Sequence, residues 1–211
     1  MARASRLGAL LVCLGGLLAM HGSVAAAADA APPIAPIVAV WKMQRLTFEY
    51  RGYSTLYSCR SLHDKLKVIL IGVGAREGID LRRYACDEAS GIARFQIRFE
   101  SPVVATSENV VAITTHDSTE ELVARVNGTH LENAVDVQRF AAVWRTVSFA
   151  RDREMKLAPG DCELVEQVRQ QILPQLSIQI LRDNVHCSTV FGNISAPRLT
   201  VSALTATNED E

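Results

Sequence analysis

Four cysteines and three histidines are the residues of this chain whose types and spacing could support chemistry. Cys59 and His63 are four residues apart, which places them on one face of a helix, and His186 directly precedes Cys187. Thiolate and imidazole groups are ligands that zinc and copper prefer. No C-x-x-C or H-x-x-x-H spacing accompanies them, however, and each cysteine has a potential disulfide partner in the sequence. We therefore predict no metal site and no other cofactor.

The run "THDSTEE", residues 115–121, places His116, Asp117 and Ser118 in consecutive positions. A hydrolase relay requires the nucleophile to contact the base, whereas consecutive side chains point in different directions. Neither a G-x-S-x-G nor an S-x-x-K motif occurs, so we assign no catalytic residue. The alternative is an envelope enzyme or metal-binding protein whose site forms only in the fold. Its residues would come from His63, His116, Asp117 and His186.

An arginine-rich strand face is the third candidate site. In "RFQIRFE", residues 94–100, apolar residues alternate with polar ones, which predicts one face toward the core and one toward solvent. The solvent face and a neighbouring strand would carry Arg82, Arg94 and Arg98. Guanidinium groups suit an anionic partner, such as an envelope polymer, a lipid head group or an acidic protein. The simpler interpretation is a solvated face that nearby carboxylates balance.

Residues 1–28 have the composition of a signal peptide. Arg3 and Arg6 precede an apolar run from about Leu7 to Met20, and an alanine-rich stretch follows. The run is shorter than a bilayer span, which takes roughly 20 residues, so cleavage would leave no transmembrane anchor. Residues 29–40 would then form an Ala/Pro leader. Export would place the remaining cysteines, Cys59, Cys86, Cys162 and Cys187, where thiols oxidise.

The stretches that follow Cys59 and Cys162 share one apolar pattern. In both, apolar residues occur 3, 10, 11 and 14 positions after the cysteine, which is helical spacing. The two sets are Leu62, Ile69, Leu70 and Val73, and Val165, Ile172, Leu173 and Leu176. Ser58 and Asp161 precede the cysteines and are expected to be N-cap residues. A strand that leads to a second cysteine follows each helix, so we predict the disulfides Cys59–Cys86 and Cys162–Cys187.

This pattern predicts an α+β fold with two tandem, disulfide-clamped β-α-β-β units and a mostly antiparallel sheet. The sequence is compatible with one continuous sheet or with two small lobes. Each unit has a tryptophan, Trp41 or Trp144, shortly before its first strand. The predicted boundaries are residues 41–100 for the first unit, 101–143 for a partly helical connector, 144–205 for the second unit and 206–211 for a disordered acidic tail.

Glycines mark two predicted helix ends. Gly72 and Gly74 follow the first helix and are expected to terminate it, because a dinucleotide loop would need a strand before its glycines. In the connector, a helix from about Thr119 to Val126 is expected to end at Asn127-Gly128.

Two segments of the chain resemble a known group of proteins. They are "FEYRGYSTLYSCRSLHDKLKVILIGVGAR", residues 48–76, and "DCELVEQVRQQILPQL", residues 161–176, each followed by a later cysteine. This double motif resembles uncharacterised exported proteins of Gram-negative bacteria. The resemblance implies a periplasmic location and no particular activity.

The composition is that of a globular protein. The chain has 211 residues, of which 48% are hydrophobic and 21% charged, and its net charge is −1. Nucleic-acid binding is not expected, because neutralising phosphates requires a basic excess. The sequence contains features that stabilise a fold, namely helix caps and paired cysteines, but no catalytic motif. We therefore predict a non-enzymatic binding or structural module of the cell envelope. Its partner would be an unidentified envelope component, and the sequence is compatible with any oligomeric state.

Overall fold

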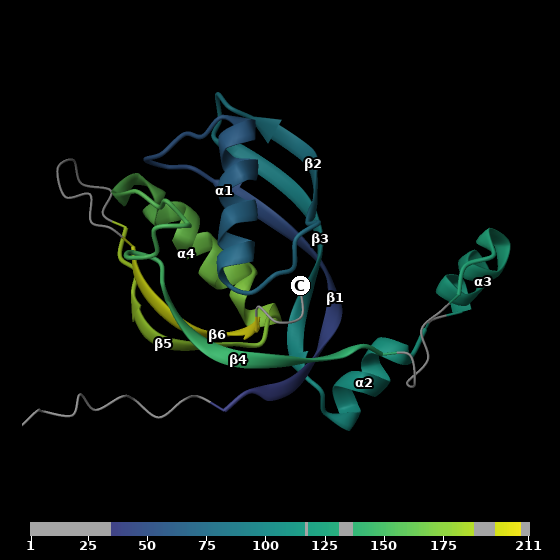
Figure 1. Cartoon of the computed structure of the whole chain (residues 1–211). Helices are drawn as coiled ribbons and strands as arrows, with labels where there is room; N and C mark the ends of the chain where they lie inside the picture. The colour runs from purple at the N-terminus through teal and green to yellow at the C-terminus, as the bar shows by residue number, and fades with distance from the viewer. Residues whose placement is uncertain (1–34, 117, 131–136, 188–196, 208–211) are drawn as a thin grey trace, which may run out of the picture. The chain divides into compact units, whose positions relative to one another are not determined.

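The computed structural model describes residues 35–116, 118–130, 137–187 and 197–207, which form a six-stranded antiparallel sheet and four α-helices. The sheet order is β2-β3-β1-β4-β6-β5 (Figure 1). The strands are β1 (Ile37–Arg51), β2 (Asp80–Asp87), β3 (Ile92–Val104), β4 (Arg139–Ser148), β5 (Ile178–Asn184) and β6 (Arg198–Ala206). The helices are α1 (Cys59–Gly72), α2 (Ser107–Thr114), α3 (Ser118–Asn127) and α4 (Cys162–Gln171), with 3-10 turns η1 (Pro159–Asp161) and η2 (Leu173–Gln175). The predicted α+β fold with an antiparallel sheet is confirmed.

The centre of the sheet is a short pairing between β1 and β4. β1 pairs with β3 along Ala39–Arg51 but with β4 only along Ile37–Val40. β1 therefore leaves β4 after Val40. Its backbone N–H and C=O groups beyond that point need other partners wherever they are shielded from water.

The main hydrophobic core lies between the sheet and the helices α1 and α4, which lie on the same face of it (Figure 1). The strands contribute alternate residues, for example Phe48 and Tyr50 in β1, as expected from the two-residue repeat of a strand. The helical positions predicted to be apolar are buried at Leu62, Ile69, Leu70, Val73, Val165, Ile172 and Leu173, and Leu176 is partly buried.

Three element boundaries differ from those expected. β1 begins inside the predicted leader 29–40, and β3 ends and β4 begins inside the predicted connector 101–143. Both tryptophans lie within strands, and Trp41 stacks on Phe140 with ring centroids 4.5 Å apart. The physical reason is long-range pairing, since Ala39 pairs with Val104 on one side and with Phe140 on the other. The predicted signal peptide and tail residues 208–211 lie outside the described residues.

Helix α1 has the expected ends. Ser58 Oγ accepts a hydrogen bond from the Ser61 amide at 3.1 Å, and Glu88 accepts one from the Cys59 amide at 2.8 Å. At the other end, the Ala75 amide donates to the Leu70 carbonyl at 2.9 Å, which is the Schellman pattern. Gly74 has φ +97° there, and a Cβ atom at this position would lie 2.3 Å from the Leu204 carbonyl oxygen. A glycine is therefore required.

Helix α3 matches the predicted helix to within one residue at each end, and Gly128 follows it with φ +62°. Helix α2 begins at a cap formed by Thr106, whose side chain accepts from the Asn109 amide. No helix in the described part of the chain is long and apolar enough to cross a membrane.

Two disulfide bonds, as the sequence predicts, link Cys59 to Cys86 and Cys162 to Cys187. Their Cα–Cα distances are 6.1 Å and 5.6 Å, and the linked residues are 27 and 25 positions apart in sequence. Each bond joins the first residue of a helix, α1 or α4, to the chain at or just after the following strand.

Candidate functional site

The most concentrated polar cluster surrounds Asp161, at the start of α4. Asp161 is 2% exposed, and its carboxylate accepts hydrogen bonds from Lys65 Nζ at 2.7 Å, from the Ala158 amide at 2.6 Å and from the Tyr57 hydroxyl. Asp161 is the N-cap residue of α4, as expected, but its side chain makes no cap hydrogen bond to that helix. The competing partners, Lys65 and Tyr57, come from the first half of the chain.

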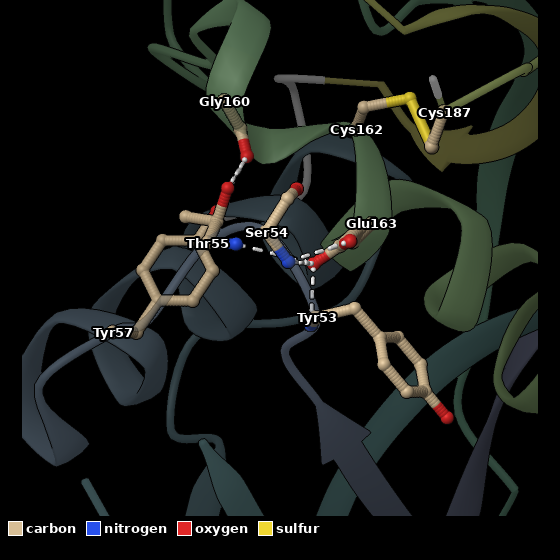
Figure 2. Close-up of a disulfide and its surroundings, with 8 residues drawn as sticks. All are labelled: Tyr53, Ser54, Thr55, Tyr57, Gly160, Cys162, Glu163 and Cys187. Carbon is tan, nitrogen blue, oxygen red and sulfur yellow. Dashed lines mark hydrogen bonds between the residues drawn. A yellow bond between two sulfur atoms is a disulfide. The ribbon is translucent and has the colours of Figure 1, made fainter. Parts of the chain in front are cut away.

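A second buried carboxylate, Glu163, binds the loop that follows β1. It is 6% exposed and accepts hydrogen bonds from the amides of Tyr53 at 3.0 Å, Ser54 at 3.0 Å and Thr55 at 3.3 Å (Figure 2). The Thr55 hydroxyl donates to the Gly160 carbonyl at 2.9 Å, beside the Cys162–Cys187 disulfide. The loop is thus held against the start of α4 by charge-assisted hydrogen bonds.

Two tyrosines complete this cluster as hydrogen-bond donors. Burial, together with the hydrogen bond to Asp161, raises the pKa of Tyr57 well above its usual range. Burial also raises the pKa of Tyr50, and the Tyr50 hydroxyl donates to the Thr55 carbonyl at 2.7 Å. A tyrosine that acts as a general base needs a lowered pKa. Both hydroxyls therefore remain protonated at neutral pH and serve as structural donors.

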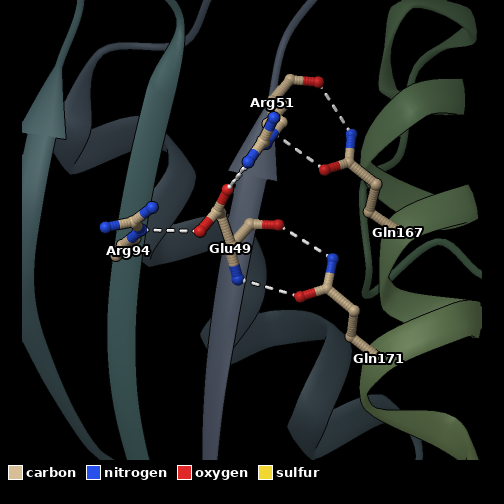
Figure 3. A network of polar contacts seen from close by, with 5 residues as sticks. All are labelled: Glu49, Arg51, Arg94, Gln167 and Gln171. Carbon is tan, nitrogen blue, oxygen red and sulfur yellow. Dashed lines mark hydrogen bonds and ion pairs between the residues drawn. The ribbon is translucent and has the colours of Figure 1, made fainter.

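Glutamine side chains of α4 pair with the free edge of β1. Gln171 accepts from the Glu49 amide at 2.9 Å and donates to its carbonyl at 2.8 Å, and Gln167 makes the same pair with Arg51 at 2.8 Å and 2.9 Å (Figure 3). The Glu49 carboxylate is hydrogen-bonded by Arg94 and Arg51, both at 2.6 Å, which lowers its pKa.

A groove of about 540 Å³ lies between the end of β1 and α4. Its lining includes Glu49, Arg51, Glu163, Gln167 and Gln171, whose polar groups already bind one another or the loop after β1. We therefore assign no ligand to this groove.

The three histidines that were candidate site residues lie on different elements. His63 is on α1, where its Nδ1 lies 2.9 Å from Asp64 Oδ1, and it lines a pocket of about 520 Å³ with Arg60 and Arg83. His116 follows α2 and His186 precedes Cys187; neither lines that pocket, and Asp117 lies outside the described residues. Among the residues that the structure describes, no three His, Cys, Asp or Glu side chains are placed to hold a metal ion.

The predicted arginine face is present, but its members differ in their partners. Arg94 binds Glu49, and Arg82 binds Asp80 at 2.9 Å, whereas Arg98 makes no hydrogen bond or ion pair with a described residue. Arg45 of β1 lies directly opposite Arg98. Local sequence reasoning missed Arg45, because the β1–β3 register is a long-range property.

Sequence reasoning also missed the buried polar cluster. Lys65 gave a weak signal, because it lies between Leu62 and Leu66 along the buried stripe of α1. Glu163 gave none, since a carboxylate in a first helical turn is ordinary on an exposed helix. The polar groups at the start of α4 are occupied internally, and the arginines on the opposite sheet face are directed outward. Comparison of the chain with protein-family models, with curated proteins and with solved structures found no match.

Proposed function

We propose that the protein is an exported, non-enzymatic binding or structural module of the cell envelope. The observation that carries the proposal is the internal hydrogen bonding of the buried polar cluster. Asp161 and Glu163 are both buried, and each accepts three or more hydrogen bonds from internal donors. A general acid or base must exchange protons with a substrate, whereas both carboxylates are buried and bound by donors of the protein itself. They serve to fix the loop after β1 to α4.

Export is supported by the signal-like N-terminus and by the two disulfide bonds, since disulfides persist in oxidising compartments. The same proposal includes descent of the two halves from one β-α-β-β unit. Its support is the order of elements: β1-α1-β2-β3 and β4-α4-β5-β6. The sheet runs β2-β3-β1 in one half and β5-β6-β4 in the other, so that both first strands meet at the centre.

Cell fractionation tests the exported state. The full chain, expressed in a Gram-negative host, is expected in the periplasmic fraction with no thiol that a maleimide reagent can label without prior reduction. The matched control lacks residues 1–28 and is expected to stay in the cytoplasm with labelled thiols. Retention of the full chain in the cytoplasm with reduced thiols would contradict the proposal.

One observation favours an envelope enzyme as the second candidate. His63 and Asp64 form a contact of 2.9 Å at a pocket that Arg60 and Arg83 also line. An oriented histidine beside two cations has the groups needed to act on an anionic ester. Hydrolysis of a chromogenic phosphate or carboxylate ester that is lost in His63→Ala, and retained in His186→Ala, would establish this candidate over the binding module.

A further inference from the structure

The α1 disulfide, Cys59–Cys86, and the α4 disulfide, Cys162–Cys187, occupy equivalent places in the fold. Cys59 and Cys162 are each the first residue of a helix, and each is 8% exposed. Their partners, Cys86 and Cys187, are both partly buried. Cys59 lines the pocket of about 520 Å³ and Cys187 lines the groove of about 540 Å³, so each bond borders a depression of similar volume. Burial and position on a helix therefore do not distinguish the two bonds.

The pocket beside the α1 disulfide contains two arginines without partners. Arg60 of α1 and Arg83 of β2 both line it, and neither side chain makes a hydrogen bond or ion pair with a described residue. Arg83 pairs with Phe95, which is fully buried, so the strand alternation places both side chains on the helix side of the sheet. Asp64, a carboxylate in the same lining, contacts His63 instead. With His63 neutral, the described lining has a net positive charge.

Two further carboxylates near the α1 disulfide are bound outside this pocket. Asp87 and Glu88 directly follow Cys86 in the chain. Asp87 accepts a hydrogen bond from the Ala89 amide at 3.1 Å, and Glu88 accepts one from the Cys59 amide at 2.8 Å. Neither carboxylate lines the pocket. A reagent in the pocket therefore lies beside the arginines and not beside these two carboxylates.

The groove beside the α4 disulfide has the opposite charge. Its lining includes Glu163 and Glu166, neither of which forms an ion pair with a described residue. Glu163 is hydrogen-bonded by three backbone amides, which are neutral, and it follows the disulfide cysteine of α4 in the chain (Figure 2). Glu49 and Arg51 also line the groove, but they form an ion pair with each other. The groove should therefore repel an anionic reagent that the pocket on α1 attracts.

We propose that the α1 disulfide is a thiol-exchange site that reacts with anionic thiols, and that the α4 disulfide is the inert bond of the pair. The attacking species in thiol–disulfide exchange is a thiolate, so the rate depends on local charge as well as on access. The two bonds close loops of 27 and 25 residues, so the difference lies in the rate of attack and not in stability. This activity goes beyond that of a binding or structural module.

The exchange consists of two balanced steps. In the first step, a thiolate attacks Cys59 Sγ, the bond to Cys86 breaks, and Cys86 leaves as a thiolate that takes a proton from water. In the second step, another thiolate attacks the reagent sulfur of this mixed disulfide and releases Cys59 as a thiolate, which is also protonated. Two reagent thiols are thereby oxidised to a disulfide, and the protein disulfide is reduced to two thiols.

Two thiols of opposite charge test the proposal on the folded, oxidised protein. Glutathione is anionic and cysteamine is cationic, and each is added to a separate sample. Free thiols are then alkylated and located by peptide mass spectrometry. Glutathione should open the α1 disulfide at least about tenfold faster than the α4 disulfide, because the two depressions differ in charge. Cysteamine should lower this ratio, and high salt should lower the ratio for glutathione.

Two substitutions test the charged groups separately. Arg83→Ala should lower the rate of glutathione attack on the α1 disulfide about threefold, and Glu166→Gln should raise the rate at the α4 disulfide by about the same factor. Arg125→Ala, which removes an exposed arginine of α3, is the matched control and should change neither rate. Thermal unfolding verifies that each variant is folded.

Four outcomes would overturn the proposal. They are equal rates for the two disulfides with glutathione, the same ratio of rates with glutathione and with cysteamine, an unchanged rate at the α1 disulfide in Arg83→Ala, and no reaction of either bond in the folded protein. Cell fractionation decides export separately, so failure of the exchange proposal remains distinct from failure of the proposed function.

Discussion

At the scale of single residues, the junction between α4 and the loop after β1 is held by two buried carboxylates. Removing one carboxylate from water costs several kcal/mol, and this cost is offset only when strong donors surround the charge. Asp161 meets an ammonium group, a hydroxyl and an amide, and Glu163 meets three successive amides. The donors for both come mainly from residues 53–65, so the cluster stabilises one arrangement of two segments that are distant in sequence.

Replacement of Glu163 by glutamine should destabilise the protein although the side chain keeps its shape. The amide NH2 group would face backbone N–H donors, and one oxygen would replace two. We expect a loss of about 2 kcal/mol in the free energy of unfolding by urea. Glu166 lies one turn along the same face of α4 and is partly buried, so Glu166→Gln is the control. This substitution should change the free energy of unfolding by less than about 0.5 kcal/mol. Equal effects of the two substitutions would contradict the role assigned to Glu163.

The raised pKa of Tyr57 predicts a loss of stability at alkaline pH. A group whose pKa is higher in the folded state than in the unfolded state stabilises the fold below its unfolded pKa, which is about 10 for tyrosine. Above that pH the unfolded chain releases the proton first, and stability falls by about 1.4 kcal/mol per pH unit for each such tyrosine. Between pH 10 and 11, where the unfolded tyrosine is only partly ionised, the free energy of unfolding by urea should therefore fall less steeply with pH in Tyr57→Phe, by about 1 kcal/mol per pH unit. Tyr84→Phe, at an 83% exposed position, is the control, and an unchanged slope in Tyr57→Phe would refute the prediction.

At the scale of elements, α4 replaces a missing neighbour of β1. Residues two apart in a strand are separated by about 6.8 Å, and residues four apart in a helix by about 6 Å. This match lets Gln167 and Gln171 reach the backbones of Arg51 and Glu49 as a neighbouring strand would. The free edge that β1 acquires when it leaves β4 is thereby closed.

Loss of these glutamines should open the β1 edge locally. In Gln167→Ala/Gln171→Ala, the Glu49 and Arg51 amides lose their acceptors, and we expect hydrogen exchange at both to accelerate at least tenfold. Gln170→Ala, an exposed position on the same helix, should leave both rates unchanged. Unaltered protection of Glu49 and Arg51 in the double variant would show that the glutamines do not close the edge.

Local sequence patterns predict much of this fold. The features that they do not predict depend on pairing between strands that are distant in sequence. The helices after Cys59 and Cys162 follow from apolar spacing, and the end of α1 follows from Gly74. The starts of β1 and β4 could not be predicted, because they depend on the β1–β4 pairing. Asp161 illustrates the same limit at the site: its position suggests a helix cap, and only the folded chain brings Lys65 and Tyr57 to it.

At the scale of the whole molecule, the two halves share little sheet but many polar contacts. β1 and β4 pair over four residues on each strand, Ile37–Val40 and Arg139–Ala142. The contacts of Asp161, Glu163 and the α4 glutamines form a second connection between the halves. The hydrophobic core that both halves share forms a third. The described residues accordingly belong to one compact unit rather than to two lobes.

This coupling predicts that the disulfides stabilise one shared transition. Each closes a loop of similar length, 27 and 25 residues, and restricting the unfolded chain in this way stabilises the fold by about 3.5 kcal/mol per bond. Cys59→Ala/Cys86→Ala and Cys162→Ala/Cys187→Ala should therefore lower the midpoint of a single cooperative transition to a similar extent. Urea unfolding followed by tryptophan fluorescence and by circular dichroism should give coincident curves for each variant. Two separate transitions, with only one of them shifted in each variant, would mean that the halves fold independently and that the contacts between α4 and β1 do not couple them.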